Sequence, residues 1–317
     1  MEQIYKDLTK EIKRHNCVIL MAHKNIDLDA FGSLLCLYEI VLSFNKQAKI
    51  VMNKTVNASV KKAMRKVTDI EYCYKEKEAN ETDLLIVADT HKENLVENIN
   101  ILKKIKDKIV LDHHVKDANY IKDTIASYID SNASSTVEII IHYLKSLNKV
   151  VNPTIASIML AGLEIDTNSF DIKTTDKTYE TAAMLYRLGS NNALKKELLQ
   201  QNKEEYIKRQ ALLKHAHIIN KNIAICVFTD EIYNKEDLSI IANELLQFDN
   251  VEVGFAIGKI DKQTTGISGK SLSNFNVEEI MHKLGGGGHF NNAATQLKRT
   301  TLKKAEEMLL TLIEEDI

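Results

Sequence analysis

The chain has 317 residues, enough for about two domains, and its hydrophobic fraction of 44% and charged fraction of 27% are typical of a globular protein. Its 42 basic residues nearly balance 44 acidic ones, so no global positive field favours long duplex nucleic acid. The charged first segment lacks an apolar signal core, and no apolar run approaches the roughly 18 residues of a membrane span. Four cysteines without CxxC spacing predict free thiols and a cytoplasmic protein.

Short apolar runs alternate with helical patterns through the first half of the chain. The runs are rich in β-branched residues and nearly unbroken in apolar character, which is typical of strands buried on both faces of a parallel sheet. They occupy residues 17–22, 49–52, 83–89 and 108–112. Amphipathic helical patterns lie between them, for example at 30–43 and 93–105. This alternation predicts an α/β fold with a mainly parallel sheet that is flanked by helices.

The second half begins with a helical region and then starts a new set of elements. Helical patterns run from about residue 135 to 219. They are followed by a strand at 222–228, a helix at 236–247, a hairpin of 251–260 with 265–272, and helices at 276–284 and 301–315. We therefore expect a catalytic domain at 1–190, a helical linker at 191–220 and a smaller α+β domain at 221–317.

Acidic and histidine side chains follow the predicted strands of the first domain. They are His23, Asp27 and Asp29 after the first run, Asp89 after the third, Asp112, His113 and His114 after the fourth, and Asp166 after an apolar helix. A single aspartate at a strand end more often caps a helix or a turn. Ligands of open parallel sheets, however, bind outside the carboxyl ends of the strands. So many carboxylates and imidazoles at one edge would repel each other without cations, which predicts a metal centre.

The chemistry of this set indicates which metal it would hold. Carboxylate oxygens with a minority of imidazole nitrogens suit Mn²⁺, with Mg²⁺ or Fe²⁺ as substitutes, and do not suit a thiolate-rich zinc site. Two such ions about 3.5–4 Å apart can share one carboxylate and support in-line attack of hydroxide on phosphorus.

A glycine-rich segment near the C-terminus, LGGGGHFNNAATQL at 284–297, is the other informative pattern. Consecutive glycine amides can form an anion-binding nest, and His289 can donate to a phosphate or to a base edge. The alternative is a flexible loop, which glycine runs often form. Lys270, in TGISGKSL, can supply a positive charge to a phosphate, or is simply a solvated surface charge.

Five of these motifs occur in an order that resembles a known superfamily. HKNIDLD, VADTHK, LDHH and LAGLEIDTNSF resemble the metal motifs of DHH phosphoesterases, and GGGGHFNNAATQ resembles the substrate-binding motif of the DHHA1 domain. The resemblance spans about residues 15–312. Within the superfamily, the DTHK, ASSTVE, DTNSF and NAATQL segments are most similar to the catalytic portion of GdpP-type cyclic-di-AMP phosphodiesterases.

The resemblance implies a role for each matching residue. One Mn²⁺ would be held by His23, Asp27 and Asp89, and a second by Asp29, Asp89, His113 and Asp166. Asp89 would bridge the two ions, and His114 would lie beside the scissile phosphate. The nucleotide would be bound by Gly286, Gly287, Gly288, His289, Asn292 and Lys270. Lys270 stands where relatives often have arginine, and lysine lacks the bidentate phosphate contact of a guanidinium.

The resemblance also implies an activity, a Mn²⁺-dependent hydrolysis of cyclic-di-AMP to the linear dinucleotide pApA, with further cleavage to AMP left open. One alternative is a nanoRNase or pAp phosphatase that acts on short linear oligonucleotides with the same residues. Another is a nucleotide-sensing module without catalysis, although the complete ligand set argues against it. Full-length GdpP-type proteins carry membrane and sensory regions ahead of this portion. We expect a natural short form or an excised catalytic part, without a membrane segment, as a single chain or a homodimer.

Overall fold

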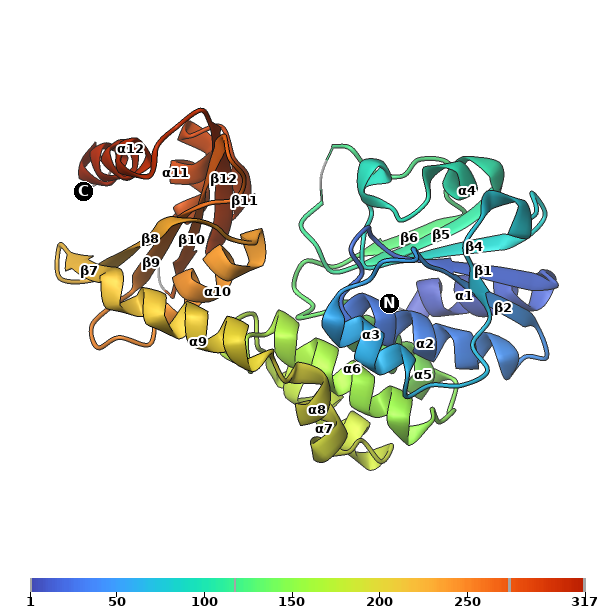
Figure 1. The fold of residues 1–317 in the computed structure, drawn as a ribbon. Coiled ribbons are helices and arrows are strands. Elements are labelled where there is room, and N and C mark those ends of the chain that lie inside the picture. The colour runs from blue at the N-terminus through green and yellow to red at the C-terminus, as the bar shows by residue number, and fades with distance from the viewer. Residues whose placement is uncertain (1, 117, 273–274, 316–317) are drawn as a thin grey trace. The chain divides into compact units, whose positions relative to one another are not determined.

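The computed structural model of the chain describes residues 2–116, 118–272 and 275–315. The chain divides into two compact units, Met1–Gln200 and Gln201–Ile317 (Figure 1). The segment 191–220 contains α8 (Asn192–Leu199), α9 (Lys203–Leu212) and β7 (Ala216–Ile219). Residues 216–219 were expected to be helical, but they form a strand because they pair with β8 of the second unit.

The first unit is built around a six-stranded sheet in the order β3-β2-β1-β4-β5-β6. Its strands are β1 (Cys17–Met21), β2 (Gln47–Val51), β3 (Tyr72–Cys73), β4 (Leu84–Ala88), β5 (Asp107–Asp112) and β6 (Ala126–Ile129). Every pairing between neighbours is parallel, which confirms the predicted α/β fold with a parallel sheet. The two edge strands β3 and β6 were not expected, because they are short and carry no long apolar run.

Helices cover both faces of this sheet (Figure 1). The larger core joins one face to α1 (Glu2–Arg14), α2 (Leu28–Leu42), α5 (Thr136–Ser146) and α6 (Pro153–Asp166). The other face packs against α4 (Ile99–Lys104). The same unit also contains α3 (Ala58–Met64), α7 (Asp176–Arg187) and α8. The helix predicted at 93–105 is wrong in extent, because Asn98 is extended and caps α4 with its side chain.

Helices α2 and α6 pack so closely that their contact requires glycine. A Cβ placed on Gly162 of α6 would lie 2.6 Å from the backbone of Asp29 in α2. A Cβ on Gly32 of α2 would lie 3.0 Å from the Cα of Met159. This close approach brings the end of α6, where Asp166 lies, next to the first turn of α2, where Asp29 lies.

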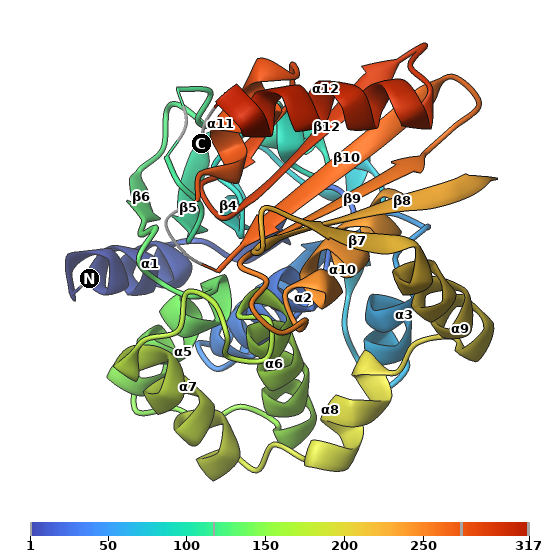
Figure 2. The ribbon, with the colours of Figure 1, turned by 90° about the vertical axis from the view of Figure 1, so that its left-hand side faces the viewer.

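The second unit contains a mixed sheet in the order β11-β12-β10-β9-β8-β7. Its strands after β7 are β8 (Ile223–Ile232), β9 (Val253–Lys259), β10 (Thr264–Ser271), β11 (Gly287–His289) and β12 (Asn292–Lys298). The β9–β10 pairing is antiparallel, which confirms the predicted hairpin, and only β8 and β9 are parallel among the pairings of the described residues. One face packs against α11 (Val277–Lys283) and α12 (Leu302–Glu315), and the other against α10 (Lys235–Leu245) (Figure 2).

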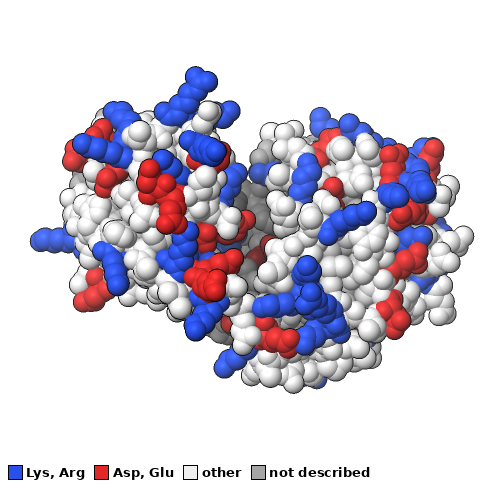
Figure 3. Space-filling model, in the orientation of Figure 1, with Lys and Arg blue, Asp and Glu red and all other residues white. Residues whose placement is uncertain are grey.

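The surface carries charges of both signs. On the face shown in Figure 3, Lys and Arg side chains of each unit lie among Asp and Glu side chains. Among the described residues, no helix combines the length and the apolar character that a membrane crossing requires.

Candidate metal centre

The predicted ligands of the first unit come together at the carboxyl edge of its sheet, where β1, β4 and β5 end. Ligand-type atoms of three groups lie within 4.8 Å of one another: Asp89 with His113 and His114, His23 with Asp27 and Asp89, and Asp29 with His113 and Asp166. Asp89 and His113 each belong to two groups. The seven residues therefore form one connected cluster.

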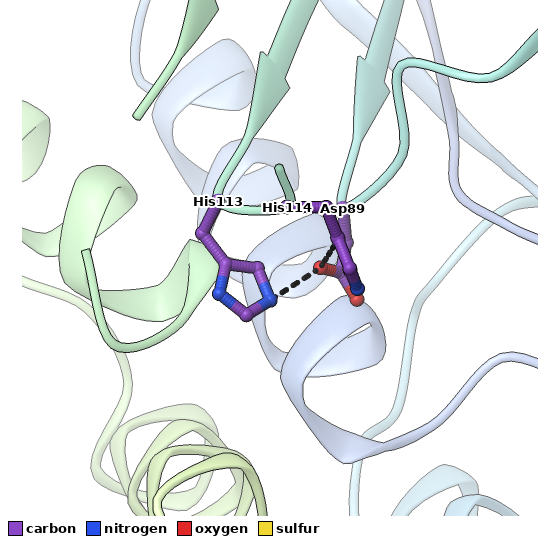
Figure 4. Close-up of side chains that lie close together, drawn as sticks. All are labelled: Asp89, His113 and His114. Carbon is purple, nitrogen blue, oxygen red and sulfur yellow. Dashed lines mark ion pairs between the residues drawn. The ribbon is translucent and has the colours of Figure 1, made fainter. Parts of the chain in front are cut away.

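Asp89 lies at the middle of this cluster. It follows β4 with a left-handed backbone, φ 62°, and its amide continues the sheet by donating to the Leu111 carbonyl at 2.9 Å. Its buried carboxylate lies 3.3 Å from Nε2 of His23. It also lies 3.3 Å from Nε2 of His113 and 3.7 Å from Nδ1 of His114 (Figure 4). Burial alone would raise the pKa of Asp89, but the facing imidazoles hold it well below its usual range.

His23 and Asp27 form one side of the cluster. Asp27 is the N-cap of α2, and its Oδ1 accepts the Ala30 amide at 3.0 Å, while Oδ2 lies 3.6 Å from Nε2 of His23. Nδ1 of His23 lies 2.7 Å from the Lys24 carbonyl, an acceptor, so it carries a proton and turns Nε2 toward the carboxylates. Burial would lower the pKa of His23, but Asp27 and Asp89 outweigh it and raise the pKa to about 12.

Asp29 is fully buried and is held by the start of helix α5. Its two carboxylate oxygens accept the backbone amides of Thr136 at 2.8 Å and Val137 at 2.9 Å. These amides belong to the first turn of α5 and have no partner within the helix. The Thr136 hydroxyl also donates to Asp89 Oδ1 at 2.9 Å. Thr136, to which the sequence gave no role of its own, therefore contacts two predicted ligands at once.

His113 and Asp166 form the other side of the cluster. Nε2 of His113 lies 3.2 Å from Asp166 Oδ2, yet neither ring nitrogen of this buried imidazole has a hydrogen-bond partner among the described residues. Burial raises the pKa of Asp166 to about 6. The pKa of Asp29 is also raised, first by its burial and then by the negative charges of Asp166 and Asp89.

Asp112 contacts two histidines, His114 of the cluster and the neighbouring His91, and orients both rings. It is fully buried, and its oxygens lie 2.8 Å from Nδ1 of His114 and 2.5 Å from Nδ1 of His91. Burial would raise its pKa, but the hydrogen bonds from His114 and His91 lower it. The sequence placed Asp112 at this edge but gave no sign that it would fix both rings.

These contacts fit divalent cations. A buried imidazole without hydrogen bonds, facing two carboxylates, has the surroundings of a metal ligand, and His23 presents its Nε2 in the same way. Several buried carboxylates at one edge of the sheet also repel one another unless positive charge lies nearby. Among the described residues of the cluster, only the histidines can supply such charge. The residues present can therefore hold metal ions.

The predicted substrate residues lie in the second unit, on three adjacent strands. Lys270 of β10 pairs with Asn292 of β12, which pairs with His289 of β11. The segment 287–289 is therefore a strand and not a flexible loop; the side chain of His289 lies outside the described residues. Burial lowers the pKa of Lys270 to about 8, so its ammonium is not the simple solvated charge considered as an alternative.

Close packing accounts for two of the glycines. A Cβ on Gly286 would collide with the Ala294 carbonyl oxygen, and one on Gly288 would collide with that of Asn292. Gly287 has open space at the same point. Positions 286 and 288 therefore need glycine so that this segment can pack against β12, independently of any role in binding the substrate.

Comparison with known proteins assigns the chain to a family. Residues 17–163 match the DHH family, N-terminal domain, and residues 220–316 match the DHHA1 domain. The chain belongs to the DHH family, as its motifs predicted.

Among individual relatives, the cyclic-di-AMP phosphodiesterase GdpP of Bacillus subtilis is 33% identical over 312 residues. The match covers 94% of this chain and 47% of that protein, so the chain spans about half the length of this relative. A probable bifunctional oligoribonuclease and PAP phosphatase, NrnA of Streptococcus mutans, is 26% identical over 90% of this chain and 91% of its own length. The crystal structure of an exopolyphosphatase-related protein from Bacteroides fragilis has the same fold, with a TM-score of 0.85, 20% identity, and coverage of 98% and 96%.

Proposed function

We propose that the chain is a phosphodiesterase that uses two Mn²⁺ ions to open cyclic-di-AMP to pApA. Asp89 and His113 each belong to two ligand groups, and this sharing carries the proposal, because two adjacent metal sites need common ligands. The named activity of the Bacillus subtilis relative supports the choice of substrate. Two divalent cations in such a centre supply an activated water and neutralise charge on the phosphate.

The residues of the first unit would divide the work as follows. One cation would be held by His23, Asp27 and Asp89, and the other by Asp29, Asp89, His113 and Asp166. Thr136 keeps Asp89 in place, and the start of α5 keeps Asp29 in place. We assign His114 to the scissile phosphate, because Asp112 orients its ring and its side chain is 39% exposed, the most of the three histidines in the cluster.

The second unit would bind the nucleotide. Lys270 and Asn292 pair across neighbouring strands, which puts an ammonium and an amide within reach of one ligand. Gly287 has open space where a side chain would stand, so a ligand could approach its backbone there. We assign Lys270, Asn292, His289 and the segment Gly286 to Gly288 to this role.

A linear substrate is the second candidate. The relative from Streptococcus mutans is matched over nearly its whole length, and its printed name describes an oligoribonuclease and PAP phosphatase. The same metal residues would serve either substrate, so the substrates must be compared directly.

Metal-dependent turnover tests the proposal. The purified chain, freed of metal with a chelator, should hydrolyse cyclic-di-AMP only after Mn²⁺ is restored, and Asp89→Asn should not regain activity. If the restored protein binds cyclic-di-AMP without cleaving it, the chain is a sensor and the proposal is wrong.

A further inference from the structure

A cavity of about 550 Å³ opens on the first unit, and the proposed roles of the cluster do not account for it. Its lining includes Asn132, Phe170, Lys173 and Tyr179. We propose that this cavity is a subsite for a purine nucleobase of the substrate. The inference rests on the proposed function, since it assumes that the phosphate at the metal centre belongs to a nucleotide.

Two aromatic rings form a stacking platform in this cavity. The rings of Phe170 and Tyr179 lie nearly parallel, at 15°, with centroids 5.7 Å apart. Phe170 also packs against the main core of the unit, so it anchors the pair. Tyr179 is 59% exposed, although its ring is large and mostly apolar. Phe170 thus fixes the pair, and Tyr179 leaves an aromatic surface exposed to solvent. Unpaired bases stack on exposed aromatic rings of this kind, and the stacking does not depend on which base it is.

The backbone that presents Phe170 is unusual. Asn168, Ser169 and Phe170 all have left-handed backbones, with φ of 48°, 60° and 70°. Left-handed conformations are unfavourable for non-glycine residues, and for a bulky one in particular. The buried Thr167 holds the turn, because its Oγ1 accepts the Phe170 amide at 3.1 Å and its carbonyl accepts the Asp171 amide at 2.9 Å. Three successive strained residues are typical of a functional constraint on the ring they position.

Two residues that line the cavity are linked to the metal cluster. Phe170 follows Asp166 by four residues, so their Cα atoms are at most about 14 Å apart. Asn132 also lines the cavity. Its amide donates to Asp130 Oδ1 at 3.1 Å, and the Asp130 amide donates to the carbonyl of Asp112 at 2.9 Å. A nucleotide with its phosphate at the cluster could therefore reach the platform with its base.

The polar lining suits the edge of adenine. Asn132 is exposed, and its side-chain amide has no hydrogen bond within the described part of the chain. An asparagine amide offers a donor and an acceptor that match N7 and the amino group of adenine. Asp171 and Lys173 also line the cavity, so its charged side chains balance and the choice of ligand rests on the aromatic pair and the amide.

Activity on two substrates tests the subsite. Cyclic-di-AMP carries bases, whereas bis(p-nitrophenyl) phosphate is a phosphodiester without nucleobases. Tyr179→Ala should raise KM for cyclic-di-AMP about tenfold and leave hydrolysis of bis(p-nitrophenyl) phosphate unchanged, because the metal centre is intact. Tyr179→Phe should restore the low KM. Tyr186→Ala is the matched control, since Tyr186 is 45% exposed on the same helix but does not line the cavity.

Binding gives a readout that does not depend on turnover. The chain has no tryptophan, so Tyr179→Trp introduces a single indole whose fluorescence can be excited separately from that of the tyrosines. AMP should quench this fluorescence and ribose 5-phosphate should not, while neither should affect Tyr186→Trp. Loss of the proposed function would appear as a wild type inactive on cyclic-di-AMP. Failure of the subsite would appear as an active wild type whose Tyr179→Ala variant slows equally on both substrates, or as fluorescence of the Tyr179→Trp variant that AMP leaves unchanged.

Discussion

Thr136→Val is the substitution that most sharply tests how the metal ligands are held. Thr136 is fully buried at the start of α5, where its amide donates to Asp29 and its hydroxyl donates to Asp89 at 2.9 Å. Valine has nearly the same shape and keeps the backbone amide. The substitution therefore removes one donor from the shared carboxylate and leaves the contact to Asp29 in place.

The size of the effect follows from the kind of bond that is lost. A hydrogen bond to a charged group contributes about 1.5–3 kcal/mol. The part of this energy that holds Asp89 in its ligand position should appear as weaker metal binding. Residues that orient metal ligands in this way typically contribute about 10–100-fold to metal affinity or activity. We therefore expect Thr136→Val to weaken Mn²⁺ binding by about 10–100-fold.

Calorimetric titration of the metal-depleted protein with Mn²⁺ measures this effect without relying on turnover. Thr136→Ser keeps the hydroxyl and should bind Mn²⁺ nearly as tightly as the wild type. The circular dichroism spectrum of each variant should match the wild type, which separates a local effect from unfolding. Mn²⁺ affinity that is unchanged in Thr136→Val would refute the positioning role of this hydroxyl.

Further predictions concern the shared ligand, the buried lysine and the metal itself. Asp89→Ala should abolish kcat because it removes a carboxylate common to two ligand groups, whereas His289→Ala should mainly raise KM; equal losses of kcat at constant KM would contradict this division. Burial lowers the pKa of Lys270 to about 8, so its ammonium is charged below that pH and loses its proton above it. KM should therefore rise above about pH 8 in the wild type and rise less in Lys270→Arg, and parallel pH profiles would exclude the phosphate contact. Excess Mn²⁺ should raise Tm, since a ligand at about 100 times its Kd stabilises the folded state by about 2.7 kcal/mol, and Asp166→Asn should reduce this gain in differential scanning fluorimetry.

Much of the first unit could be predicted from the sequence because parallel strands buried on both faces leave a plain apolar pattern. The runs that became β1, β2, β4 and β5 carry that pattern. β3 has two residues and β6 is a short edge strand with partly exposed side chains, so neither could be recognised. Asn98 interrupts the helix predicted at 93–105, since its side chain caps α4 and its own backbone is extended.

In the candidate site, too, features that depend on neighbouring residues in the sequence could be predicted, and contacts between segments far apart in the sequence could not. Asp27, Asp29, Asp89 and His113 could be singled out because each follows an apolar run along the chain. Thr136 could not, since its role depends on the start of α5 meeting Asp29 from 107 residues away. The φ of 62° at Asp89 and the close contact of α6 at Gly162 likewise exist only in the folded chain.

The central claim is tested most directly by the product profile of cyclic-di-AMP and pApA supplied side by side to the purified chain with Mn²⁺. A two-metal phosphodiesterase specific for the cyclic substrate should convert cyclic-di-AMP to pApA with a higher kcat/KM than it shows for the linear dinucleotide. Failure to cleave cyclic-di-AMP, with efficient hydrolysis of pApA or pAp in the same samples, would contradict the claim and identify a linear-oligonucleotide phosphoesterase.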